Sequence, residues 1–206
     1  MSHVSEDTTT IRPILHHINL KTGRLQEMID WYSTVLGMTS NYQFPGGAWL
    51  TNDEANHRLA LLVSPQLSDD LDKWMHTGFH HSAFEYPTMG DLLDTYSRLK
   101  PLSIEPHASL DHGLTTSFYY EDPDGNSVEL QADNFGSWQE SSEWMRTSPQ
   151  FAADPIGKPV DPDQMVAARQ AGASFAELHQ RAYAGEFKPS GPMDLHVPLG
   201  DPRSPV

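Results

Sequence analysis

The sequence predicts an α+β fold of two tandem βαβββ modules followed by a helical extension. Three observations support this prediction: a strand containing a His pair precedes an amphipathic helix twice, the two copies share one register, and three strand-like runs follow each helix. Each module is too small to close its own core, so we expect the two to fold as one domain. The expected ranges are 1–10 for a disordered N-terminus, 11–70 and 71–135 for the modules, and 136–206 for the extension.

The first module opens with "PILHHINLKT", whose alternating pattern predicts a strand. Within that strand His16 and His17 point to opposite faces. Apolar residues then recur at helical spacing from Leu25 to Leu36, and Gly37 supplies the stop signal. The runs "TSNYQF", "GAWLTN" and "HRLALLVS" lie between turn residues and predict three further strands.

The second module repeats this order. In "GFHHSAFEY", His81 lies 64 positions after His17, and at the same offset the apolar face of the first helix meets a second apolar face. The tetrapeptide "DWYS" likewise aligns with "DTYS". A capping-box-like "TMGD" opens the second helix, and "IEPHAS", "LTTSFYYE" and "NSVELQA" predict three strands. A register shared by strand, helix and tetrapeptide indicates a duplication.

The extension has different signals. Asp161 and Pro162 form an N-cap and first-turn pair, and "SFAE" at 174–177 is a capping box for a helix that Gly185 would end. The Pro-rich stretch "KPSGPMDLHVPLGDPRSPV" predicts an arm that lies over the surface or over a partner subunit. We therefore expect residues 136–206 to be a helical, Pro-rich addition to the duplicated domain.

Composition limits the possible partners. The net charge is -15 and Lys and Arg form no cluster, which argues against nucleic acid and against anionic membranes because nothing would neutralise phosphates. The absence of Cys excludes disulfides and thiolate chemistry. No apolar run approaches 18 residues and the N-terminus lacks a secretory pattern, so the expected location is cytoplasmic.

One carboxylate stands in an otherwise apolar strand. In "NSVELQA", Val128 and Leu130 share the apolar face, which places Glu129 on the opposite face. A strand Glu is solvated, paired or bound to a cation, and the pattern alone leaves all three open. His17 and His81 occupy equivalent places in the two modules, and two His with one carboxylate form the facial triad that suits divalent iron.

The phrases "LHHINLKT", "WYSTVLGM", "FHHSAFEY" and "FYYEDPDGNSVEL" together resemble the vicinal oxygen chelate (glyoxalase-like) superfamily, and within it the type I extradiol dioxygenases of aromatic hydrocarbon catabolism. The resemblance covers residues 13–133. Its most specific part is "HGLTTSFYYEDPDGNSVE", with Leu110 before it as a mild departure. The resemblance implies that His17, His81 and Glu129 bind Fe(II), with Mn(II) as an alternative.

The same resemblance implies three catalytic side chains. His57, in "ANHRLALL", would be the acid/base beside dioxygen, although the apolar strand around it also suits a buried structural His. Tyr119 and His112 would hydrogen-bond the oxygens of a small aromatic diol that dioxygen cleaves next to a hydroxyl-bearing carbon. Exposed sheet edges favour a homo-oligomer. The remaining His of the two modules are expected to be non-ligands: His16, His76, His80 and His107.

Other activities of the same fold stay open. A glyoxalase or epimerase usually has a fourth ligand, a second carboxylate, where this chain has "LALLVSP". A metal-free binding module would not need His17, His81 and Glu129 together, and an epoxide-opening thiol transferase would not need Tyr119 and His57. Cleavage of a hydroquinone or an aminophenol instead of a catechol is a further alternative.

Overall fold

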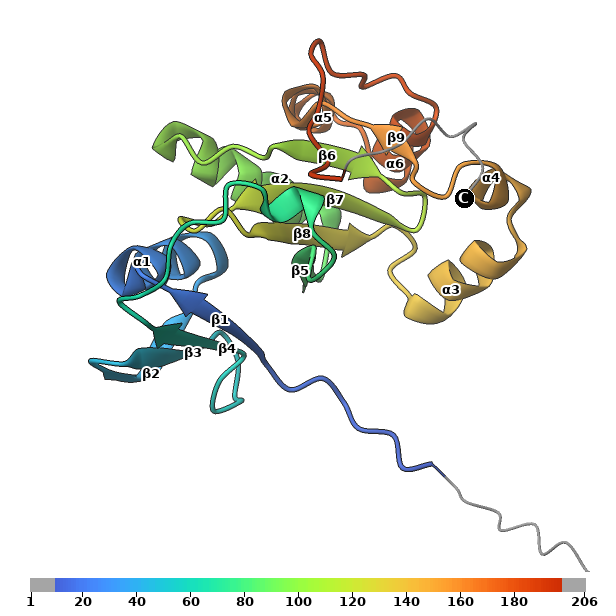
Figure 1. Ribbon diagram of the computed structural model, residues 1–206. Helices are drawn as coiled ribbons and strands as arrows, with labels where there is room; N and C mark the ends of the chain where they lie inside the picture. The colour runs from blue at the N-terminus through green and yellow to red at the C-terminus, as the bar shows by residue number, and fades with distance from the viewer. Residues whose placement is uncertain (1–9, 198–206) are drawn as a thin grey trace, which may run out of the picture.

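The computed structural model describes residues 10–197 and contains two mixed sheets with the same strand order, β1-β4-β3-β2 and β5-β8-β7-β6 (Figure 1). In each sheet the first strand runs parallel to the fourth and the other neighbours are antiparallel. The duplicated α+β fold is thus confirmed. The first sheet comprises β1 (Ile18–Thr22), β2 (Thr39–Phe44), β3 (Gly47–Thr51) and β4 (Leu59–Val63). The second comprises β5 (His81–Tyr86), β6 (Ala108–Asp111), β7 (Thr115–Glu121) and β8 (Ser127–Asp133).

One helix packs on each sheet. Helix α1 (Leu25–Leu36) contacts β3 and β4, and α2 (Met89–Leu99) contacts β5 and β8. Gly37 ends α1 in the left-handed region at φ 65°, where glycine carries no Cβ penalty. Thr88 caps α2 by accepting the backbone N–H of Asp91. Two short 3₁₀ segments, η1 (Lys73–Met75) and η2 (Lys100–Leu102), lie in the connections.

The two modules share one hydrophobic core, as their small size requires. It contains the buried faces of both main helices and of strands from both sheets. Polar contacts also join the modules: Arg24 forms an ion pair with Asp124 at 2.6 Å, and the Arg98 guanidinium donates to the carbonyl of Thr34 at 2.7 Å. The fully buried side chains at this junction include Met28, Tyr32, Leu50, Leu61, Leu92, Phe118, Tyr120, Val128 and Leu130.

The "DPDGN" turn between β7 and β8 is held from within by Asp122. Its Oδ1 accepts the backbone N–H groups of Asp124 and Asn126 at 3.0 and 2.9 Å, and Tyr32 of α1 donates to its Oδ2 at 3.1 Å. Gly125 adopts φ 71°, as such a turn needs. The turn fixes the start of β8 and therefore the position of Glu129, three residues along the strand from Asn126.

Within the described residues, the extension adds four helices and a short strand, and the predicted caps are present. Asp161 accepts the backbone N–H groups that begin α5 (Pro162–Gln170), and Ser174 and Glu177 form a capping box at α6 (Phe175–Tyr183). A two-residue strand, β9, pairs antiparallel with β6 and was not predicted from the sequence. The elements are α3 (Trp138–Thr147), α4 (Pro149–Ala153), β9 (Lys158–Pro159), α5 (Pro162–Gln170) and α6 (Phe175–Tyr183).

Several strands begin later than predicted, and one of them, β4, begins at Leu59 rather than at His57. The first strand begins at Ile18 rather than before the His pair, and Ile14 and Leu15 are exposed. The reason is that β1 pairs only with β4, whose register begins with Ile18 opposite Leu59, so earlier residues have no partner strand. Strand β6 begins at Ala108, later than "IEPHAS" suggests.

The predicted disordered N-terminus and the end of the predicted arm fall largely on residues 1–9 and 198–206, which lie outside the described range.

Candidate active site

A row of polar side chains lies on the face of the second sheet that points away from the shared core. Glu129 at the middle of β8 is only 5% exposed, although its neighbours Val128 and Leu130 belong to the core on the other face. His81, at the start of β5, places Nε2 3.0 Å from Oε2 of Glu129. Tyr119, directly opposite Glu129 on β7, donates its hydroxyl to Oε1 at 3.0 Å.

His112 continues this row from the turn after β6. Its Nε2 lies 2.9 Å from the Tyr119 hydroxyl, and its Nδ1 donates to the carbonyl of Ile156 in the extension at 2.5 Å. Gly113 beside it adopts φ 86°, and a Cβ there would lie 2.3 Å from the Trp144 ring of α3. The extension therefore packs directly against the turn that presents His112.

The environment sets the protonation states in this row. Burial alone would raise the pKa of Glu129, but hydrogen bonds from His81 and Ser117 outweigh it and leave the pKa below its ordinary value. Burial, together with the charge of Glu129, raises the pKa of Tyr119. At neutral pH Glu129 is therefore a carboxylate and Tyr119 a protonated phenol that can donate a hydrogen bond.

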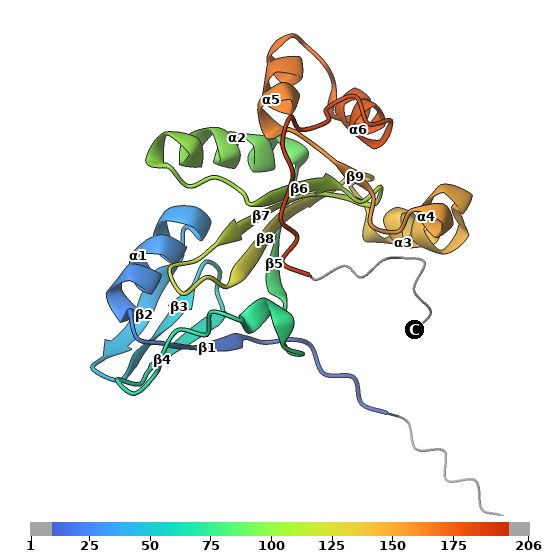
Figure 2. The same cartoon turned by 45° about the horizontal axis from the view of Figure 1, so that its top comes forward.

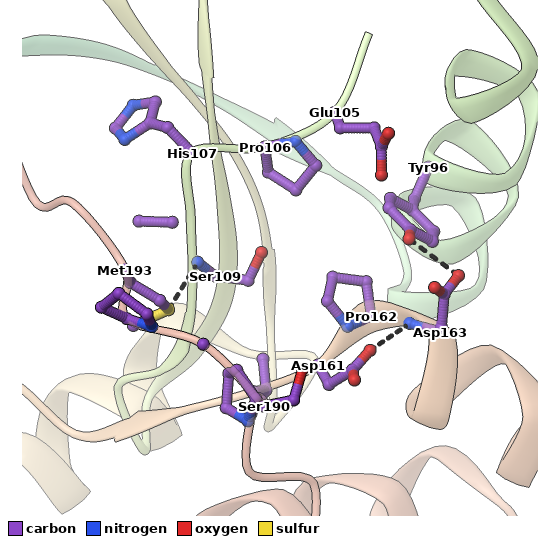
Figure 3. A pocket seen from close by; sticks show the side chains of 15 residues that line it. Tyr96, Glu105, Pro106, His107, Ser109, Asp161, Pro162, Asp163, Ser190 and Met193 are labelled. Carbon is purple, nitrogen blue, oxygen red and sulfur yellow. Dashed lines mark hydrogen bonds between the residues drawn. The ribbon is translucent and has the colours of Figure 1, made fainter. Parts of the chain in front are cut away.

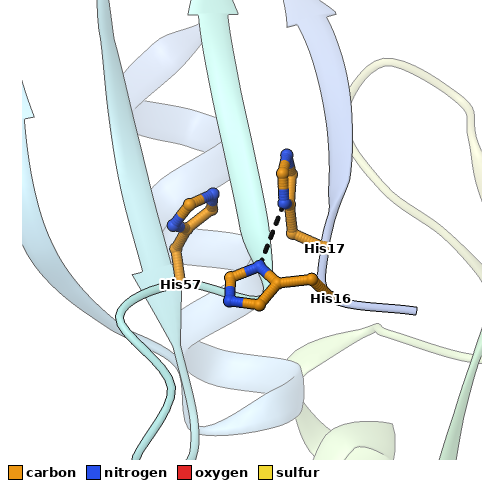
Figure 4. Close-up of side chains that lie close together, drawn as sticks. All are labelled: His16, His17 and His57. Atoms are coloured by element: carbon orange, nitrogen blue, oxygen red, sulfur yellow. Dashed lines mark hydrogen bonds between the residues drawn. The ribbon is translucent and has the colours of Figure 1, made fainter. Parts of the chain in front are cut away.

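A second cluster lies at the edge of the first sheet, where His16, His17 and His57 come together (Figure 4). The His17 and His57 rings are 4.3 Å apart between centroids, and Nδ1 of His16 is 3.1 Å from Nδ1 of His17. His57 lies in the loop before β4 rather than in the strand, and burial together with the two neighbouring imidazoles lowers its pKa. A His with this environment is neutral at pH 7 and can accept a proton.

The six predicted site residues thus occupy two clusters, one in each module. Glu129, His81, Tyr119 and His112 form the row on the second sheet, whereas His17 lies with His57. Within residues 10–197, His16, His17 and His57 are the one group of three potential ligands whose donor atoms all lie within 4.8 Å of one another. The structure therefore brings together two of the three predicted metal ligands, and the assignment of His17 as the third stays a prediction.

The residues of the row fit a divalent metal. A histidine nitrogen and a carboxylate oxygen converge 3.0 Å apart, and the carboxylate is buried. Among the described residues, the ion-pair partner of Glu129 is His81, with no Lys or Arg to neutralise it. A buried carboxylate that lacks a fixed cationic partner suits a cation, and mixed nitrogen and oxygen donors suit iron and manganese.

The sequence analysis expected His80 to be a non-ligand and did not predict its contact with His81. His80 places Nδ1 2.7 Å from Nδ1 of His81 and donates from Nε2 to the carbonyl of Leu195 at 3.0 Å. The available signal was the adjacent His pair itself, because one ring of such a pair can support the other. The contact with Leu195 has no signal in the sequence, since its acceptor is a backbone carbonyl 115 positions away.

The chain has two βαβββ modules with the same strand order, and an imidazole and a buried carboxylate lie on the open face of the second sheet. These features define a protein of the vicinal oxygen chelate fold. A family model, described as the Glyoxalase/Bleomycin resistance protein/Dioxygenase superfamily, matches residues 14–130. The chain belongs to that superfamily.

Curated relatives extend the match into the C-terminal helices. The chain is 40% identical to biphenyl-2,3-diol 1,2-dioxygenase 2 of Rhodococcus globerulus, over 89% of this chain and 95% of the relative. It is 42% identical to biphenyl-2,3-diol 1,2-dioxygenase 3 of the same organism, over 85% of this chain and 92% of the relative. A catechol-2,3-dioxygenase of Bacillus subtilis is 29% identical over 69% of this chain and 48% of its own length. Of the helices described, none has the length and apolar character needed to cross a membrane.

Proposed function

We propose that this protein is an extradiol dioxygenase, which opens a catechol-type ring with dioxygen next to a hydroxyl-bearing carbon. The observation that carries the proposal is the row in which the buried Glu129 carboxylate meets His81 and the Tyr119 hydroxyl, each at 3.0 Å. The proposal is supported by the similarity to dioxygenases named for biphenyl-2,3-diol over most of both chains.

The metal is Fe(II), with Mn(II) as the alternative, held by His17, His81 and Glu129. When bound, it supplies Lewis-acid and one-electron chemistry to the diol and to dioxygen. His17 is exposed and directly precedes β1, at the position equivalent to His81 at the start of β5. That equivalence, together with the family resemblance, supports His17 as the third ligand.

The protein's own side chains then handle protons and orient the substrate. Tyr119 keeps its proton and presents a donor beside Glu129, where one diol oxygen would lie. His112, anchored by the Ile156 carbonyl, fixes the Tyr119 hydroxyl from the other side. His57 is neutral at pH 7, so it can take a proton from the diol and return it as the bond between the two oxygen atoms breaks.

The substrate class is an aromatic diol, of the type of 2,3-dihydroxybiphenyl or catechol. No carboxylate stands in β4, whose residues Leu59–Val63 are all apolar, and this disfavours the four-ligand glyoxalase alternative. A homo-oligomer in the cytoplasm completes the proposal. Light scattering of the purified protein tests the oligomer.

The deciding experiment is anaerobic reconstitution with Fe(II), followed by 2,3-dihydroxybiphenyl or catechol in air. The native protein should form a yellow ring-cleavage product, and Glu129→Gln should form none. Glu105→Gln, which changes an exposed carboxylate in the loop before β6, serves as the matched control and should retain activity. If the native protein binds iron and yields no coloured product from either diol, ring cleavage of catechols is wrong.

A further inference from the structure

A C-terminal arm, defined here as residues 189–197, runs back across the open face of the second sheet (Figures 1 and 2). His107 donates from Nδ1 to the Asp194 carbonyl at 2.7 Å, and the backbone N–H of Ser109 contacts the Met193 sulfur at 3.3 Å. Met193 and Leu195 pack against the small apolar cluster that contains Tyr119. The arm therefore covers the face that carries the polar row.

The end of the arm is anchored by His196. Its ring is stacked on His107 at 4.0 Å and on Trp74 at 4.2 Å between centroids, and the residue is only 8% exposed. Its backbone adopts φ 55°, an uncommon conformation for a residue other than glycine, and its N–H is held by the Asp194 carboxylate at 2.8 Å. A residue kept in such a conformation by its surroundings indicates a specific docked position.

Two cavities lie away from the row. One of about 240 Å³ separates the arm from the start of α5 and the loop around Pro106 (Figure 3), and another of about 700 Å³ lies between β1 and the "DPDGN" turn. Neither is lined by any of the six predicted site residues. The arm instead reaches the row by direct contact.

That contact runs through His80. The carbonyl of Leu195 can only accept, so the proton on His80 is at Nε2, which donates to it at 3.0 Å. Nδ1 of His80 is then the acceptor, and the proton in the 2.7 Å contact between the two Nδ1 atoms belongs to His81. With a proton on Nδ1, Nε2 is the nitrogen of His81 that can give up its proton to bind a metal, and it is the atom that faces Glu129.

We propose that the C-terminal arm is part of the metal site, and that His80 is the positioning residue that keeps a proton on Nδ1 of His81, so that Nε2 is the nitrogen left to bind the metal. The tautomer of a metal-binding His is set by the hydrogen bond of its other nitrogen, and the partner is usually a carbonyl, a carboxylate or a water. Here the partner is a second imidazole whose own orientation depends on the arm. This inference rests on the proposed metal site.

The test compares His80→Phe with His80→Gln. Phe keeps a ring but has no nitrogen, whereas Gln offers an oxygen to accept from His81 and an amide to donate to Leu195. Anaerobic calorimetry with Fe(II) should show affinity about 10- to 100-fold weaker for His80→Phe, with most of it restored in His80→Gln. His76→Phe, an exposed His at the end of η1, is the matched control and should bind as the native protein does.

A second readout needs no metal. Nitrogen-15 NMR of the His side chains, at a pH above about 8 where free imidazoles are neutral, should show His81 protonated on Nδ1 in the native protein. In His80→Phe the proton on Nδ1 should be lost in favour of the form protonated on Nε2 alone, with the fold confirmed by circular dichroism. If His80→Phe changes neither the iron affinity nor the tautomer of His81, this inference is wrong and the proposed function is unaffected. A native protein that binds no Fe(II) would overturn the proposed function with it.

Discussion

Replacing Tyr119 with Phe removes one oxygen atom from the centre of the polar row. That hydroxyl lies 3.0 Å from Glu129 and 2.9 Å from His112, and the residue is 8% exposed, so water replaces it poorly. A hydrogen bond to a charged group contributes about 1.5–3 kcal/mol, and about 1.4 kcal/mol is a factor of ten in rate. We therefore expect kcat/KM for 2,3-dihydroxybiphenyl to fall by about 10- to 150-fold.

Stability should change much less than activity. Glu129 keeps His81 as a partner, so the loss in unfolding free energy should be about 1 kcal/mol, which lowers Tm by about 2–4 °C in a chain of this size. The assay follows the yellow product under steady-state conditions, with bound iron measured in each sample so that rates are compared per metal site.

The neighbouring Tyr120 provides the control. It is fully buried on the opposite face, and its hydroxyl has no hydrogen-bond partner within the described structure. Tyr120→Phe should therefore leave activity unchanged and stability equal or higher, because it removes an unpaired buried polar group. The reasoning fails if iron-loaded Tyr119→Phe stays within about twofold of the native rate, or if both variants lose the same amount.

Three further predictions concern the fold. Asp122→Ala should lower the unfolding free energy by about 3 kcal/mol or more, because it leaves several buried donors in the "DPDGN" turn unpaired; chemical denaturation measures it. Gly47→Ala should cost at least about 2 kcal/mol, since a Cβ there would lie 2.2 Å from the Leu61 carbonyl oxygen, and a native Tm would contradict this. The ammonium of Lys100 lowers the pKa of Asp163, so this pair stabilises above about pH 4 and its contribution is lost as pH falls through the lowered pKa. Asp163→Asn should therefore cost about 0.2–1 kcal/mol at pH 7, and this cost should disappear once the pH is below the lowered pKa.

Local patterns predicted much of the fold. The helix from Leu25 to Leu36 and its stop at Gly37 agree with the structure because periodicity and a glycine cap act over a few residues. The alternation around Glu129 placed it on the face opposite Val128 and Leu130, which strand geometry fixes, and the pairing of β8 with β5 then brings it to His81. The sequence left open whether Glu129 is solvated or paired. Its 5% exposure shows that it is not solvated.

What the sequence left open depends on partners distant in the chain. The start of β1 depends on where β4 can pair, so the alternation before Ile18 extended the predicted strand too far. The separation of His17 from the row on the second sheet depends on how two modules pack, which no local pattern encodes. An arm was predicted, but its docking position on the second sheet was not, and neither was β9, because their partners include backbone groups, which carry no residue-specific signal.

The short strand β9 has a consequence for association with other chains. It occupies the free edge of β6 by pairing Lys158 with Asp111 and Pro159 with Leu110, and Pro159 lacks a backbone N–H to offer a further strand. An open edge of this kind is a template for uncontrolled pairing between molecules. Two residues of the extension thus terminate the second sheet, and a chain shortened before β9 should be prone to aggregate through the exposed β6 edge.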